Sequence, residues 1–161
     1  MAFEVALALI SPLVAVGILV VTLTKSSRSE RTRVLFELQE RYTSSPCRAG
    51  RSLIHSQVSG RSPEEVADLD RTMRDSIGRA LAIMNTIAIC VQAGYCDQRL
   101  LFFSMGRSYV LTVKAARVWL DVGERVRGFR AYEQAERLAG QLERDYGPFP
   151  TRVATSPDSV Q

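Results

Sequence analysis

The chain has 161 residues, of which 46% are hydrophobic and 24% are charged, and its formal net charge is +4. This length and balance indicate one folded domain and exclude a disordered polyelectrolyte. Glutamates are interleaved with the basic residues between Lys25 and Arg51, so we expect no nucleic-acid partner.

The first predicted element is an apolar run from Val5 to Thr24 that contains no charged side chain. An α-helix rises about 1.5 Å per residue, so about twenty residues cross a hydrocarbon core of about 30 Å. Glu4 stands where a signal peptide would carry basic residues, and no small-residue cleavage pattern follows the run. We therefore expect residues 1–24 to be an uncleaved transmembrane anchor rather than a signal peptide or a buried helix.

Basic residues flank this run on its C-terminal side: Lys25, Arg28, Arg31 and Arg33. Because lysine and arginine near a span stay on the cytoplasmic side, the run is predicted to have its N-terminus outside. The sequence thus predicts a single-pass protein of the inner (plasma) membrane, with the lipid bilayer as one partner and the C-terminal domain in the cytoplasm. In that reducing compartment the cysteines are expected to be free thiols.

Residues 25–60 are expected to form a juxtamembrane stalk followed by a short helix. Apolar residues recur at helical spacing from Val34 to Tyr42, before a Thr-Ser-Ser run ends the helix. Ser45 followed by Pro46 is typical of the start of another helix.

Residues 61–147 are predicted to fold as a cytoplasmic helical domain. A capping box with a proline in the first turn begins at Ser62, and an apolar stripe continues to Gly94, which predicts one long helix. Asp97 can cap the next helix, whose apolar face extends to Gly128. The link between these helices is short, so they are expected to form an antiparallel hairpin.

A last helix is expected from about Arg130 to Tyr146, and the polar, proline-bearing residues 148–161 are expected to be a disordered tail. The predicted fold class is all-α. It consists of an N-terminal transmembrane helix followed by a small antiparallel helical bundle built on a long helical hairpin.

The sequence lacks the common catalytic motifs. It contains no Walker-type run, no G-x-G-x-x-G and no G-x-S-x-G, and His55 is its sole histidine. Asp70 and Asp75 each have an arginine four residues away, a pattern typical of a solvated helix face rather than of a metal or catalytic cage. We therefore predict no catalytic residue, no metal and no cofactor, and a protein that is not an enzyme.

Candidates for an interaction site are Asn85, Phe102, Phe103 and Trp119. Two adjacent phenylalanines cannot both point inward on one helix, so Phe102 or Phe103 is expected to mark a docking face. Asn85 lies within an apolar stretch and needs a hydrogen-bond partner, so an interhelical bond that fixes register is its expected use. Trp119 is expected in the core or on a partner surface.

The order of anchor, stalk, helix ending in glycine, polar turn, Trp-bearing helix and short last helix resembles an uncharacterised family of bacterial single-pass membrane proteins. The residues that carry the resemblance are Leu81 to Gly94 (LAIMNTIAICVQAG), Asp97 to Leu101 (DQRLL), Trp119, Tyr132 with Glu133, and Leu138 with Ala139. That family often has an acidic residue just before the Ile-Ala step, where this chain has Asn85 and Thr86. The resemblance implies an architecture, a span followed by a cytoplasmic helical domain, and implies no activity.

These observations predict a membrane-anchored helical module that binds a protein partner, or a second copy of itself, at the cytoplasmic face of the membrane. An alternative is a phage- or prophage-related membrane protein that acts in exclusion or defence, for which small size, the anchor and the missing motifs are the support. A third hypothesis is an unrecognised enzyme that uses carboxylates near Asn85.

Overall fold

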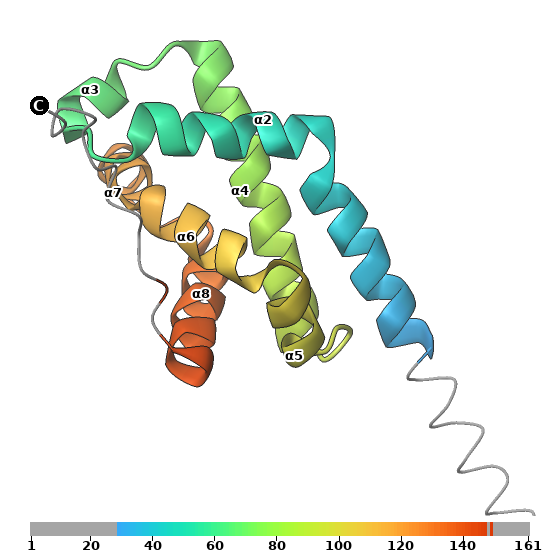
Figure 1. Cartoon of the computed structure of the whole chain (residues 1–161). Helices are drawn as coiled ribbons and strands as arrows, with labels where there is room; N and C mark the ends of the chain where they lie inside the picture. The colour runs from blue at the N-terminus through green and yellow to red at the C-terminus, as the bar shows by residue number, and fades with distance from the viewer. Residues whose placement is uncertain (1–28, 148, 150–161) are drawn as a thin grey trace, which may run out of the picture.

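The computed structural model describes residues 29–147 and 149, which form helices joined by short turns (Figure 1). The predicted all-α class is confirmed for these residues. The predicted anchor (1–24), the flanking residues Lys25 and Arg28, and nearly all of the expected tail lie outside the described residues. Within the described ranges, no helix combines the length and the apolar character needed to span a bilayer.

The first described helix covers residues 29–43 and meets α2 (Ser45–Leu53) at a sharp corner (Figure 1). Ser44 is the N-cap of α2, and its ψ of 150° interrupts the helical path. Pro46 lies in the first turn of α2, where its missing N–H would have no helical partner. The sequence predicted an N-cap at Ser45, and the observed N-cap is one residue earlier, at Ser44.

The long helix predicted between residues 62 and 94 is divided into α3 (Pro63–Ala67) and α4 (Arg71–Gln92). The predicted capping box at the start of α3 is present. A single helix was wrong because Asp70 begins a new one: its carboxylate accepts the N–H of Met73 at 2.8 Å. The apolar periodicity continues across this break and therefore conceals it.

The part of the chain predicted as the second arm of the hairpin is a helical path in successive segments: α5 (Gln98–Leu101), η2 (Phe102–Gly106), α6 (Arg107–Ala115) and α7 (Arg117–Arg127). The predicted hairpin is not the main packing of these segments, because α4 packs chiefly against α2 and α8. Asp97 caps α5 as predicted, accepting the N–H of Arg99 at 2.8 Å. The path bends at Ala116, between α6 and α7. Gly128 ends α7 as predicted, with a left-handed φ of +77° that favours glycine.

The last helix, α8 (Glu133–Tyr146), ends at Gly147 as predicted but begins three residues after the expected Arg130. Tyr132, its N-cap, has a φ of 60°, and this left-handed residue turns the chain into α8.

The helices pack around α4: α2 crosses it, α8 packs against both α4 and α6, and α3 lies against α7 (Figure 1). The close crossing of α2 and α4 depends on Gly50, because a Cβ there would lie 2.3 Å from the carbonyl oxygen of Ser76. The helix over 29–43 contributes Leu35, Leu38 and Tyr42 to the same hydrophobic cluster. The expected stalk and the expected domain therefore share a core across residue 60.

Candidate interaction site

Among the described residues, two short segments are π-helical, η1 (Ile54–Val58) and η2 (Phe102–Gly106), and both pack against α6. π-Turns are rare and are frequently found at functional sites. In η2 the backbone of Gly106 lies under the ring of Phe102, since a Cβ at this position would be 2.7 Å from that ring. The absence of a side chain at Gly106 therefore leaves room for the Phe102 ring.

A surface cavity of about 440 Å³ opens between these segments. We call it the Phe103 groove, and its lining residues come from η1, η2 and the first turns of α6: His55, Phe102, Phe103, Ser104, Met105, Gly106, Arg107, Ser108 and Leu111. The groove brings together both phenylalanines that the sequence singled out.

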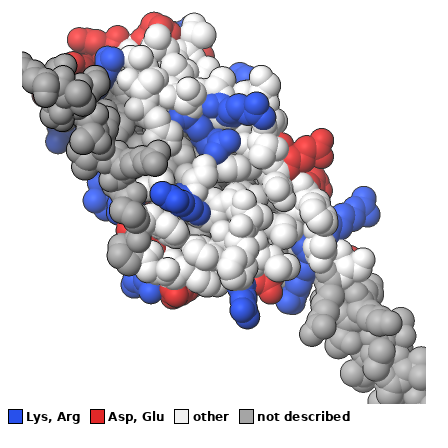
Figure 2. Space-filling model, in the orientation of Figure 1, with Lys and Arg blue, Asp and Glu red and all other residues white. Residues whose placement is uncertain are grey.

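The two phenylalanines differ in orientation, as expected for adjacent positions on one helix. The Phe102 ring stacks on Tyr146 with 3.8 Å between the ring centroids, and it is half-buried. Phe103 is 69% exposed, and Leu100, one turn earlier, is also exposed. Figure 2 shows that the described surface over α5 and η2 carries few charged side chains. Phe103 is therefore the outward-facing member of the pair.

Polar contacts form the floor behind the groove. The Ser108 hydroxyl oxygen accepts hydrogen bonds from the Tyr42 hydroxyl at 3.0 Å and from Arg51 at 2.9 Å. The Arg51 guanidinium also lies 3.9 Å from the centroid of the Tyr42 ring. Burial raises the pKa of Tyr42, so its hydroxyl stays protonated and remains a donor. These contacts join the helix over 29–43, α2 and α6.

His55 is fixed by the same layer. Its Nε2 lies 3.1 Å from the Thr112 hydroxyl oxygen, and the Thr112 hydroxyl donates to the Ser108 carbonyl at 2.8 Å. Because the single proton of that hydroxyl is already committed, His55 donates from Nε2. Burial, with a smaller contribution from Arg51, lowers the pKa of His55 and favours the neutral ring. His55 thus ties η1 to α6.

Asn85 and Trp119 lie outside the groove. The side-chain oxygen of Asn85 accepts the N–H of Ala135 at 3.1 Å and so caps α8 from another helix. This contact is the interhelical bond that the sequence predicted. The Trp119 ring is half-buried and lies 6.2 Å from the ring of Tyr132. Arg31 and Arg33 are exposed on the helix over 29–43.

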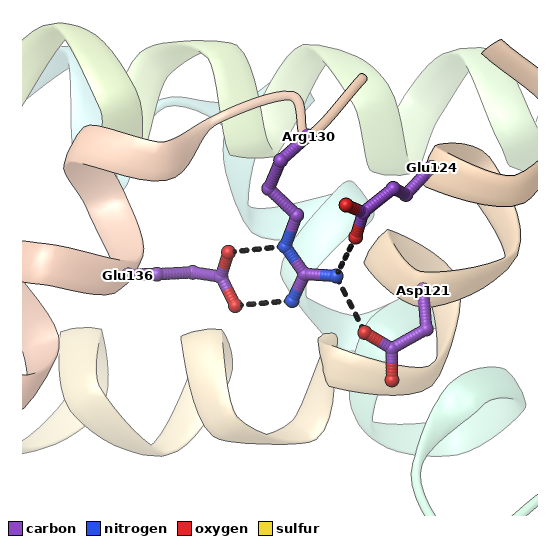
Figure 3. Close-up of polar contacts among 4 residues, drawn as sticks. All are labelled: Asp121, Glu124, Arg130 and Glu136. Atoms are coloured by element: carbon purple, nitrogen blue, oxygen red, sulfur yellow. Dashed lines mark hydrogen bonds and ion pairs between the residues drawn. The ribbon is translucent and has the colours of Figure 1, made fainter. Parts of the chain in front are cut away.

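Sequence reasoning missed an ion-pair cluster between α7 and α8 (Figure 3). Arg130 binds Glu136 through two nitrogens and also contacts Asp121 and Glu124, and its side chain is 23% exposed. The hydrogen bonds to Glu136 raise the pKa of Arg130 further above its usual range. These partners are six and nine residues away along the chain, beyond the spacing of helical ion pairs. The cluster fastens the turn that precedes α8.

The other residues of the groove were also missed, because η1 and α6 meet only through tertiary packing. Adjacent phenylalanines were the one local signal of the site. Ser108, Arg107 and Leu111 follow them with ordinary helical spacing and show no motif of their own.

Comparison with curated proteins and with solved structures gave no match. Comparison with protein families gave a match over residues 9–142, which begins within the apolar run and extends into α8. The match covers most of the chain. The protein therefore belongs to the family described as "Domain of unknown function (DUF4760)".

Proposed function

We propose that this protein is a membrane-anchored, non-enzymatic interaction module whose Phe103 groove binds a segment of a protein partner, or of a second copy, at the cytoplasmic face of the membrane. The observation that carries the proposal is an exposed aromatic side chain beside an apolar groove framed by two π-turns. Such groups are typical anchors of protein interfaces.

The groove fits a peptide segment with an apolar side chain. Burial of a phenylalanine contributes about 1.5–3 kcal/mol, and Leu111 adds apolar surface beside Phe103. Arg107 and His55 lie on the same lining and can hydrogen-bond the segment's polar groups. An apolar centre with polar groups around it is the usual composition of a protein interface.

The membrane location is part of the proposal. Its support is the uncharged run from Val5 to Thr24, with basic residues only behind it. The family match begins at residue 9, so it includes most of this run. Residues 5–24 are proposed as the span, with the described helices in the cytoplasm.

A pair of reporter fusions tests this orientation. A reporter that is active only in the periplasm, fused after Gln161, should be silent, whereas a reporter active only in the cytoplasm should be active at the same site. The reverse pattern would overturn the proposed topology. Resistance to alkaline carbonate extraction should accompany either fusion, because a spanning helix stays in the bilayer.

Photo-crosslinking in native membranes tests the groove. A benzophenone amino acid at position 103 should give a discrete adduct, either with one partner or with a differently tagged second copy. The matched control is position 129, where Phe129 is also exposed but lies outside the groove. Equal labelling from both positions would count against the groove.

The captured species then provides a binding assay. Phe103→Ser should weaken co-purification by about tenfold or more, corresponding to about 1.4 kcal/mol, because it removes the aromatic anchor. Phe129→Ser should leave co-purification unchanged. A strictly monomeric protein that gives no adduct at position 103 would refute the proposed function.

A further inference from the structure

A second cavity, of about 610 Å³, lies at the start of the helix over 29–43, where this helix meets the turn between α4 and α5. The helix lines it with Arg31, Arg33 and Val34, and the turn lines it with residues 93–95. We call this cavity the turn groove. It lies at the N-terminal end of the described residues and shares no lining residue with the Phe103 groove.

The backbone holds Tyr95 firmly at the tip of this turn. The N–H of Tyr95 bonds the carbonyl of Cys90 at 2.9 Å, and the N–H of Gly94 bonds the carbonyl of Val91 at 3.0 Å. Together with the left-handed φ of Gly94, +75°, these bonds form a Schellman motif. Tyr95 is 65% exposed, although its backbone is hydrogen-bonded.

The charges in the turn groove favour an anion. Arg31 and Arg33 are exposed, and the acidic residues that line the groove are Glu30 and Glu37. Glu37 binds Arg41 of the same helix at 2.7 Å, so its charge is compensated outside the groove. The lining has two arginines and two glutamates, and Arg41 beside Glu37 gives the region its excess of positive charge. Guanidinium groups bind phosphate oxygens with paired hydrogen bonds.

The length of the chain places this groove near a lipid surface. Position 29 follows Thr24 by five residues, which extend at most about 18 Å whatever path they take. Headgroups occupy several ångströms on each side of the hydrocarbon core, because the bilayer widens from about 30 Å to about 40–45 Å when they are included. An exposed tyrosine at this level matches the amphipathic rings that concentrate at membrane interfaces.

We propose that the turn groove binds the phosphate headgroup of an anionic phospholipid and that Tyr95 enters the interfacial layer beside it. The contact gives the helical domain a second attachment to the bilayer, next to the span. This inference rests on the proposed function, because it requires residues 5–24 to cross the membrane.

Quenching by brominated lipid tests the contact in the full chain. Tyr95→Trp in a Trp119→Phe background leaves position 95 with the sole indole, because the chain has one tryptophan. In vesicles of phosphatidylcholine with brominated phosphatidylglycerol, we expect quenching at least about twofold stronger than for Phe129→Trp in the same background. Vesicles in which only the phosphatidylcholine is brominated should quench position 95 less.

Charge variants identify the headgroup site. Arg31→Gln with Arg33→Gln should reduce quenching at position 95 to that of the control, because each arginine near an anionic surface strengthens association about fivefold. Arg79→Gln with Arg125→Gln removes the same charge from exposed positions outside the turn groove and should have no effect. Unaltered quenching in the Arg31 and Arg33 variant would overturn the headgroup site.

Two further outcomes separate the possible failures. Extraction of the protein by alkaline carbonate would refute the anchor, and with it both proposals. Carbonate resistance with equal quenching at positions 95 and 129 would refute the lipid contact alone. Loss of quenching on addition of inorganic phosphate, but not of chloride at matched ionic strength, would assign the groove to free phosphate and overturn the commitment to a lipid.

Discussion

Arg130 illustrates how one side chain can hold an otherwise open turn. Its planar guanidinium binds Glu136 through two nitrogens and directs the third toward α7, where it meets Asp121 and Glu124 (Figure 3). A lysine would carry the same charge on a single ammonium group and could not hold both directions at once.

Substitution of Arg130 should therefore destabilise the fold more as more of its hydrogen bonds to the carboxylates are lost. We expect Arg130→Lys to lower the free energy of unfolding by about 1 kcal/mol and Arg130→Ala by about 2 kcal/mol, since the carboxylates then lose their shared donor. Urea unfolding of the full chain in detergent, followed by circular dichroism, measures both. Arg137→Ala breaks an exposed helical pair with Glu133 and should change the value by less than about 0.5 kcal/mol. Equal effects at positions 130 and 137 would contradict the role of the cluster.

The cysteines should differ in reactivity. Burial, followed by the nearby Asp97 charge, raises the pKa of Cys96 to about 11, and burial also raises the pKa of Cys47. The thiolate is the reactive form, so both thiols are nearly all protonated at pH 8 and gain reactivity only as pH rises toward their pKa values. We expect Cys90, which is half-buried, to react first with Ellman's reagent. Cys90→Ser should abolish that fast phase, and denaturant should expose the others.

At the scale of single elements, helix ends with local capping side chains are the part of the fold that the sequence predicts well. Ser62, Asp97 and Gly128 each act where their residue type indicates. Asp70 was missed because an aspartate followed by an arginine at four residues fits a surface ion pair as well as an N-cap. The same residue pattern is compatible with an N-cap and with a helical ion pair, and the observed break between α3 and α4 shows that Asp70 is an N-cap.

The π-turns and the Phe103 groove could not be predicted for a different reason. Their geometry depends on which elements pack together, and α6 meets η1 across a long sequence separation. The sequence indicated that Phe102 or Phe103 faces outward but gave no sign that His55 or Leu111 would lie beside them. Local patterns identify outward-facing residues, whereas a groove requires knowledge of both walls.

Glycines on α2 and α8 should respond oppositely to the same change. Gly50→Ala would place a methyl group 2.3 Å from the Ser76 carbonyl oxygen and 2.7 Å from the Ala80 side chain, forcing α2 away from α4. We expect a loss of about 1–3 kcal/mol in the free energy of unfolding. Gly140→Ala meets its nearest neighbour at 3.6 Å, the flexible end of Arg144, and should stabilise α8 by about 0.5–1 kcal/mol. Thermal unfolding of both variants checks the signs, and a stabilising Gly50→Ala would refute the close crossing.

The adjacent residues Asn85 and Thr86 make different hydrogen bonds and should differ in their effect on stability. Asn85→Ala removes the side-chain acceptor that shares the Ala135 N–H with the Tyr132 carbonyl and should lower stability by about 1 kcal/mol. Thr86 is exposed and bonds the Ala82 carbonyl of its own helix, so Thr86→Ala should be neutral or slightly stabilising. Denaturant midpoints of the two variants provide the comparison. A neutral Asn85→Ala would show that the Tyr132 carbonyl satisfies the Ala135 N–H without Asn85.

At the scale of the whole molecule, the helix over 29–43 belongs to the bundle. Leu38 and Tyr42 lie in the same cluster as residues of α4, α6 and α8, and Tyr42 reaches Ser108. The sequence assigned this helix to a stalk because it follows the predicted span directly. The few apolar residues of this helix are buried because they pack against the core formed by the other helices.

Core membership makes a direct prediction. Leu38→Ala should lower the free energy of unfolding by about 2–4 kcal/mol, as expected for a buried leucine. Phe36→Ala, on the same helix but with 64% of the residue exposed, should change it by less than about 0.5 kcal/mol. Chemical denaturation of the full chain measures both. A stalk that stood apart from the bundle would give small effects at both positions.

The packing of the helix over 29–43 also defines a mechanical path. A displacement of its first residues would also move Leu38 and Tyr42, because the helix is continuous between them. The Tyr42 hydroxyl donates a hydrogen bond to Ser108, which lines the Phe103 groove. The helix over 29–43 therefore connects the N-terminal end of the described residues to the wall of the Phe103 groove.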